Sequence, residues 1–363
     1  MNHTGLRLGT DLHTEISSPP LETLLEKEPT TIEDAAQIVS TYRSSIDALP
    51  LETARHKLCL DNTGERLAQW LLRQPLQSEI QRHLPNAVHV APTRQLVKDF
   101  AYLVVGAGRT EILLNWVFTE DRRLYNLSWK EVLGELQWTN QVVASVCAAL
   151  LAWDADNNAD KALVCLEDSI ARFRNMFGRM RLSAGLDTTR LERSFPLLGA
   201  IVVIRRHLSS GTAHTSDTKL FDAFVAHTDA FGNDVYREFN IAMLLYRHPG
   251  GCRPQAGYAL FRQIEKNPQH ELRSIQDYRG DRAQEKVFRF AQDIAARLKQ
   301  LGRSKDAKWL QQFAAETWPL LWRPEFRKDS RDALPTSTTS GKRVSMPTFA
   351  SSGKVNLKKD CGW

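Results

Sequence analysis

A pair of glycines after an apolar run is the pattern in this sequence that comes closest to a catalytic motif. Residues 102–105 read Tyr-Leu-Val-Val and are followed by Gly106, Ala107 and Gly108. When a strand ends in G-x-G before a helix, the turn can hold a dinucleotide phosphate at the helix N-terminus. Glu111 occupies the third glycine position, where its bulk and negative charge oppose a pyrophosphate. The following residues continue a helical pattern, so we expect one helix to end here and another to begin.

Three oxygen-bearing side chains, Asp154, Asp156 and Asn158, match the start of a calcium-binding loop. Such a loop also requires glycine at its sixth position and a bidentate glutamate at its twelfth. The sequence has Ala159 and Cys165 at those positions. It also contains no H-E-x-x-H, P-loop or G-x-S-x-G pattern. We therefore expect a helix-capping turn here, and we predict no metal, no cofactor and no catalytic residue.

Arginine side chains gather in the middle of the chain. Residues 171–209 contain eight arginines against Asp187 and Glu192, which gives this stretch a net charge of +6. Guanidinium groups contact phosphates through two parallel hydrogen bonds and stack on bases, so the stretch is a candidate site for RNA or another anion. The alternative is an apolar stripe that faces the core, with a solvated basic surface beside it. The candidate binding residues are Arg172, Arg174, Arg179, Arg181, Arg205 and Arg206.

The elements that must position these residues are helices, because apolar side chains recur at helical spacing. The two clearest sets are Ile32, Ala35, Ala36, Val39, Tyr42 and Ile46, and Val287, Phe290, Ala291, Ile294, Leu298 and Leu301. Thr30 and Glu33 could begin the first helix as a capping box. Breaking residues divide the pattern into helices of about 10 to 20 residues joined by short turns. We predict an all-α fold, a helix-turn-helix array that resembles an α-solenoid.

Composition changes at both ends of the chain. Residues 1–20 end in Ser-Ser-Pro-Pro, and the last segment is rich in Ser, Thr, Gly and Lys. Such segments bury too little apolar surface to offset the entropy of ordering. We expect a flexible N-terminus at 1–20, a helical repeat-like body at 21–330 and a disordered basic tail at 331–363. Within the tail, Lys342-Arg343-Val makes Ser345 a candidate phosphorylation site.

Several turn-to-helix junctions look alike. They lie at Gly108, Asn157, Pro254 and Gly302, at intervals of 49, 97 and 48 residues. These intervals are compatible with an internal repeat of about 48 residues with one degenerate copy. The alternative is coincidence, since helix-turn-helix proteins readily produce similar junctions.

The segment Ala259-Leu-Phe-Arg-Gln-Ile-Glu265, and residues 295–313 around Leu301-Gly302-Arg303, resemble tetratricopeptide and pentatricopeptide helical repeats. The resemblance covers about a third of the chain. The spacing departs from the family's usual repeat of about 34 or 35 residues. The resemblance implies partner binding, with RNA favoured for pentatricopeptide-like proteins and protein for tetratricopeptide-like ones.

Composition limits the class of protein further. Of the 363 residues, 42% are hydrophobic and 25% are charged, the balance of a globular protein. No apolar run approaches the roughly 20 residues of a membrane helix, and the scattered cysteines favour reduced thiols inside a cell. Of the net charge of +6, residues 335–363 contribute +4, so any nucleic-acid binding must be local.

We therefore expect a non-enzymatic, intracellular helical scaffold or adaptor that binds RNA through the arginine-rich stretch. The first alternative is a scaffold for protein partners without nucleic acid, and the second is an all-helical enzyme with an unrecognised site. The sequence leaves open whether the protein acts in the mitochondrion or the cytoplasm. For RNA, replacing the arginines of 172–181 with glutamine should weaken binding without unfolding the chain, and affinity should fall with salt.

Overall fold

A computed structural model describes residues 21–29, 31–73, 91–118, 129–184, 197–210, 214–230, 234–269, 271–272 and 283–322. Every regular element in these ranges is a helix, which confirms the all-α class. The helices are α1 (Leu21–Leu25), α2 (Ile32–Asp47), α3 (Leu51–Leu60), α4 (Thr63–Arg73), α6 (Ala91–Gly106), α7 (Thr110–Phe118), α8 (Trp129–Ala152), α9 (Asp160–Ala184), α11 (Leu198–Leu208), α12 (Thr218–Ala230), α13 (Asp234–Tyr246), α14 (Pro254–Lys266), α16 (Ala283–Gln300) and α17 (Ser304–Thr317). The predicted segments 1–20 and 331–363, with Ser345, lie outside the described residues.

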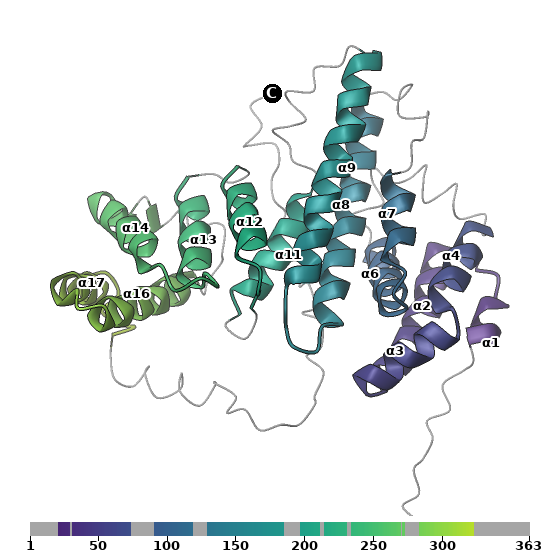
Figure 1. Cartoon of the computed structure of the whole chain (residues 1–363), viewed down its shortest axis with the longest axis horizontal. Coiled ribbons are helices and arrows are strands. Elements are labelled where there is room, and N and C mark those ends of the chain that lie inside the picture. Colours follow the sequence, from purple (N-terminus) through teal and green to yellow (C-terminus); the bar gives the residue numbers. More distant parts are fainter. Residues whose placement is uncertain are drawn as a thin grey trace, which may run out of the picture. The chain divides into compact units, whose positions relative to one another are not determined.

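The described helices form two compact units, α1 to α12 and α13 to α17 (Figure 1). In the first unit, α8 packs against α6, α7, α9 and α11, and α2 packs on α6. In the second unit, α13 packs against α14 and α16 packs against α17, while α14 also contacts α16 and α17. The second unit is therefore built from pairs of consecutive helices, as in helix-turn-helix arrays.

Helix α2 starts at a cap formed by residues that are close in sequence. Thr31 is the N-cap: its hydroxyl accepts a hydrogen bond from the Asp34 N–H at 3.1 Å. The Asp34 carboxylate in turn accepts one from the Thr31 N–H at 3.2 Å. The predicted capping box of Thr30 and Glu33 is thus wrong by one residue. The predicted apolar face is confirmed, since all its members except Ile32 are buried.

Two glycines end helices by adopting a left-handed backbone conformation. Gly108 follows α6 with φ of +73°, and Gly302 follows α16 with φ of +77°. After each glycine, the next residue's N–H reaches back five residues, from Arg109 to the Val104 carbonyl at 3.0 Å and from Arg303 to Leu298 at 2.9 Å. This pattern is a Schellman motif, which favours glycine because a Cβ is strained at positive φ.

The glycine pair at 106–108 is a junction between two helices. Helix α6 ends at Gly106 and α7 begins at Thr110, which confirms the helix-to-helix interpretation.

One member of the apolar set of α16, Leu301, lies in the turn after the helix and not on its buried face. The helical spacing predicts that side chain on the buried face, but α16 ends at Gln300 and Leu301 is 46% exposed in the turn.

Aromatic side chains dominate the core of the second unit. The ring of Phe290 on α16 meets Phe239 edge-to-face at 5.5 Å and Tyr246 at 5.7 Å, an arrangement that the ring quadrupoles favour. Gly257 lets α14 approach this core closely, since a Cβ there would lie 2.1 Å from the Ile294 Cδ1 atom. The close approach fixes α14 beside α16.

The residues that resemble a calcium loop form the predicted turn ahead of α9. The Asp154 carboxylate accepts a hydrogen bond from the Asp156 N–H at 3.1 Å, and the Asn158 side chain accepts one from the Asp160 N–H at 2.8 Å. Asp160, the first residue of α9, also accepts hydrogen bonds from the hydroxyls of Thr215 and Ser216. This carboxylate therefore fastens the segment before α12 to the start of α9.

The Asp160 contacts predict a loss of stability in acid. Burial alone would raise the pKa of Asp160, but hydrogen bonds from Ser216, Thr215 and Asn158 lower it below its ordinary value of 3.8. A lowered pKa in the folded state stabilises the fold above the unfolded pKa, and this stabilisation is lost as pH falls through the folded pKa. We expect Asp160→Asn to cost about 1 kcal/mol at neutral pH and to reduce the loss of stability below about pH 4.

Urea unfolding of both proteins at a series of pH values measures this difference. Wild type and Asp160→Asn should converge in stability as the pH falls, because protonation removes the same charge as the substitution. Parallel curves over the whole acid range would contradict the assignment.

Candidate functional site

Arg172, the first predicted binding residue on α9, is engaged by side chains of the protein itself. Its Nε donates to the Asp168 carboxylate at 2.8 Å, and its two terminal nitrogens donate to Glu111 and Asn115 of α7, each at 2.9 Å. Glu111 is the residue whose charge opposed a phosphate in the glycine-rich turn. Arg172 thus ties α9 to α7, and two carboxylates offset its charge.

The other predicted arginines differ in how far their side chains are exposed to solvent. Arg174 is exposed on α9, next to the buried Phe173. In the last turn of α11, Arg206 is exposed and Arg205 is half-buried. Cations in the last turn of a helix also interact favourably with the helix dipole.

The structure brings some of the predicted residues into one unit, because α9 and α11 pack against each other. Arg174, Arg205 and Arg206 therefore belong to neighbouring helices. Arg179 and Arg181 are on α9 as well, but their side chains lie outside the described part of the chain. The described candidates are thus Arg174, Arg205 and Arg206, which we call the α9–α11 arginines.

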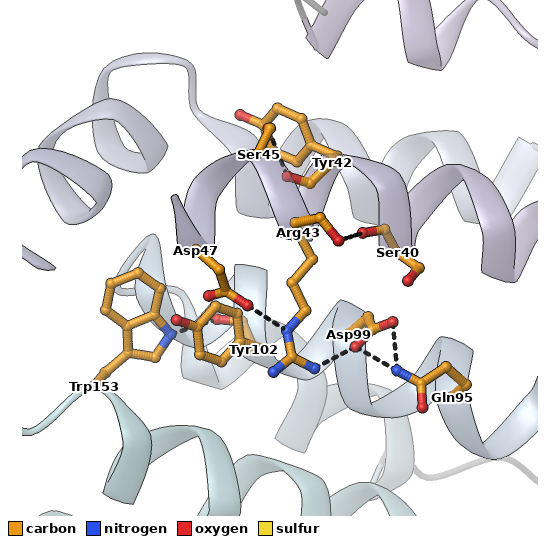
Figure 2. A network of polar contacts seen from close by, with 10 residues as sticks. Ser40, Tyr42, Arg43, Ser45, Asp47, Gln95, Asp99, Tyr102 and Trp153 are labelled. Atoms are coloured by element: carbon orange, nitrogen blue, oxygen red, sulfur yellow. Dashed lines mark hydrogen bonds and ion pairs between the residues drawn. The ribbon is translucent and has the colours of Figure 1, made fainter. Parts of the chain in front are cut away.

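A polar network that the sequence did not suggest joins α2 to α6. Figure 2 shows Arg43 of α2 reaching toward Asp99 of α6, with its guanidinium group beside the Tyr102 ring. The guanidinium carbon lies 4.4 Å from the centre of that ring. The Gln95 amide donates to both Asp99 oxygens, at 2.9 and 2.8 Å, and Arg43 also contacts Asp47 at 3.3 Å.

The burial of its charged side chains indicates that this network has a structural role and is not a ligand-binding site. The Asp99 side chain is fully buried and that of Arg43 is only 14% exposed. A ligand could reach the Asp99 carboxylate only if α2 left α6. The sequence signal for the network is a single acid within the apolar pattern of α6, which does not identify its partner on α2.

The described residues contain neither a metal-binding cluster nor a membrane-spanning helix. Within those ranges, no group of three or more His, Cys, Asp or Glu side chains could hold a metal ion. None of the described helices is long and apolar enough to cross a membrane.

The fold defines the class of this protein as all-helical. No family model, curated protein or solved structure matches the chain. The side-chain geometry described above is therefore the basis for a function.

Proposed function

We propose that this protein is a non-enzymatic helical adaptor that binds RNA through the α9–α11 arginines. The observation that carries the proposal is the exposure of Arg174 and Arg206 on two helices that pack against each other. Arginine is suited to this role because its planar fork matches phosphate oxygens and its charge persists at any physiological pH. Helices that pack against each other also fix the backbone positions of such side chains, so that binding orders only the side chains themselves.

The contacts of Arg172 make it a poor choice for substitution, whereas Arg174 and Arg206 are suitable. Replacing Arg172 would break its contacts with Glu111 and Asn115, and would therefore alter the packing of α7 as well as the surface charge. Arg174→Gln combined with Arg206→Gln leaves the Arg172 contacts intact. We expect this double variant to weaken binding of a labelled single-stranded RNA, measured by fluorescence polarisation.

Salt dependence distinguishes lost phosphate contacts from other effects. Each lost contact should reduce the slope of log affinity against log salt by about 0.7 for single-stranded RNA. The matched control is Lys27→Gln with Lys219→Gln, which removes the same charge from two exposed lysines of the same unit. An unchanged affinity and slope in the arginine variant would refute the α9–α11 site.

A scaffold for protein partners is the second candidate, and one observation favours it. Val164 on α9 and Leu198 on α11 are large apolar side chains that are 53% and 45% exposed. Exposed apolar side chains on neighbouring helices suit a protein interface. Capture of a partner protein that survives nuclease treatment, with no measurable RNA affinity, would favour this function over RNA binding.

A further inference from the structure

Arg262 of α14 lies on the face of an aromatic side chain of α17. Its guanidinium carbon is 3.7 Å from the centre of the Trp309 ring. Phe313, one turn further along α17, stacks on the same indole, with centroids 5.6 Å apart and planes 14° apart. Tyr258 meets Trp309 edge-to-face at 5.3 Å. The result is a stack of flat groups at the surface of the second unit, which we call the α14–α17 stack.

Hydrogen bonds hold the edges of this stack. Arg262 donates from Nε to the Tyr258 hydroxyl at 3.1 Å and from Nη1 to Glu265 at 3.1 Å. The Trp309 Nε1–H donates to the other Glu265 oxygen, also at 3.1 Å. The Tyr258 hydroxyl in turn donates to Asp306 at 2.9 Å.

These contacts use the edges of the guanidinium group but leave much of the side chain uncovered. The Arg262 side chain is 45% exposed. A guanidinium that is bonded at its edge and lies against an indole presents a flat outer face to solvent. Such a face attracts other flat, polarisable groups, and nucleobases are the common example.

The surrounding charge suits a polyanion. Residues 258–266 and 303–309 together contain five basic and two acidic side chains. Lys266, Lys305 and Lys308 are all exposed. Because Glu265 and Asp306 are already bonded within the stack, the lysines dominate the charge of the adjacent surface. A phosphate backbone could therefore lie beside a stacked base.

We propose that the α14–α17 stack binds an unpaired nucleobase of RNA, with the outer face of Arg262, which lies on Trp309, as the stacking surface. This inference rests on the proposed RNA-binding function and adds a second contact, made by the other unit of the chain. The two sites would recognise different parts of the RNA. The α9–α11 arginines contact phosphates, whereas the stack requires a base.

Arg262→Lys tests the inference, because it keeps the positive charge but removes the flat group. Stacking of one base is usually worth about five- to 100-fold in affinity. We expect Arg262→Lys to weaken binding of single-stranded RNA by at least about fivefold, with an unchanged salt slope. An abasic strand with the same sugar-phosphate backbone should bind wild type and variant equally.

One control and one further test variant accompany Arg262→Lys. Arg289→Lys in α16 makes the same change at an arginine that is also exposed and pairs with Glu285, and it should leave affinity unchanged. Trp309→Phe keeps a ring but loses the bond to Glu265, and it should weaken RNA binding in the same direction as Arg262→Lys. Thermal unfolding of each variant confirms that it is folded at the temperature of the assay.

The outcomes separate the two proposals. If wild type binds RNA and only the Arg174 and Arg206 variant weakens it, the stacking site is refuted and the α9–α11 site stands. The reverse pattern supports the stack and refutes the arginine site. If wild type binds no RNA, both proposals fail. A nuclease-resistant protein partner lost in Arg262→Lys, with unchanged RNA affinity, would assign the stack to protein recognition and overturn the inference.

Discussion

Replacing Asp99 with alanine is expected to lower the free energy of unfolding of the first unit by about 3 to 5 kcal/mol. The variant would leave the Arg43 guanidinium buried between α2 and α6 without the carboxylate that accepts its hydrogen bond. The Gln95 amide would lose its acceptor as well. Arg43 would keep only the half-exposed Asp47 as an ionic partner. A buried charge that has lost its buried partner costs more than the net contribution of an intact ion pair, because water no longer solvates it.

Urea unfolding followed by hydrogen exchange of peptides from α2 and α6 would measure this loss in the unit concerned. Asp47→Ala is the matched control. Asp47 also pairs with Arg43, but its side chain is 36% exposed, so we expect a cost of less than about 1 kcal/mol. An Asp99→Ala cost no larger than that of Asp47→Ala would show that the buried carboxylate is not required.

Removing both charges should be less harmful than removing one. In Arg43→Met with Asp99→Leu, the buried pair of charges is gone and apolar side chains of similar size fill the interface, while the half-exposed Asp47 is left to solvent. We expect the double variant to recover most of the stability lost in Asp99→Ala. Recovery would show that the pair is tolerated in the interface rather than required for its stability.

Gly106→Ala is expected to destabilise the first unit by about 1 to 3 kcal/mol. A Cβ at this position would lie 2.5 Å from two atoms of the Trp153 ring and 2.7 Å from the Leu58 Cδ1 atom. Trp153 has little room to move, because it is only 3% exposed, stacks on Tyr102 at 4.7 Å and donates its indole N–H to the Tyr102 carbonyl at 2.8 Å.

The sign of this effect is informative. In an exposed helix, replacing glycine with alanine stabilises by up to about 1 kcal/mol, because alanine has the higher helix propensity. A net loss in Gly106→Ala therefore identifies the clash. Trp153→Leu, which shortens the opposing side chain, should make the alanine less costly in a double-mutant cycle measured by urea unfolding. A Gly106→Ala protein as stable as wild type would contradict the predicted overlap.

Both substitutions act on α6, which lies between α2 and α8 in the packing of the first unit. Helix α8 in turn contacts α9 and α11, the helices that carry the proposed phosphate contacts. Each variant should therefore lower the fraction of folded protein without changing the RNA affinity of the molecules that remain folded. Binding measured well below the unfolding transition would test that separation.

The sequence by itself determined the class of fold and many helix ends, because those features depend on residues within one or two turns. The spacing of Val39, Tyr42 and Ile46 requires a helix whatever lies opposite. Gly108 and Gly302 end helices through hydrogen bonds to residues only three to five positions earlier. The N-cap of α2 also depends only on nearby residues, because Thr31 bonds with Asp34. The sequence alone does not show which of the two adjacent threonines is the cap.

The tertiary structure decided which charged and aromatic side chains meet. Arg172 pairs with Glu111, and Arg43 with Asp99, across separations of 61 and 56 residues. The sequence shows how many charged residues there are. It does not distinguish an arginine that pairs with an acid on a neighbouring helix from one that faces solvent. Arg262 and Trp309 likewise meet only because α14 and α17 pack together. Periodicity is a local property of the chain, whereas charge pairing and stacking depend on which faces the packed helices bring into contact.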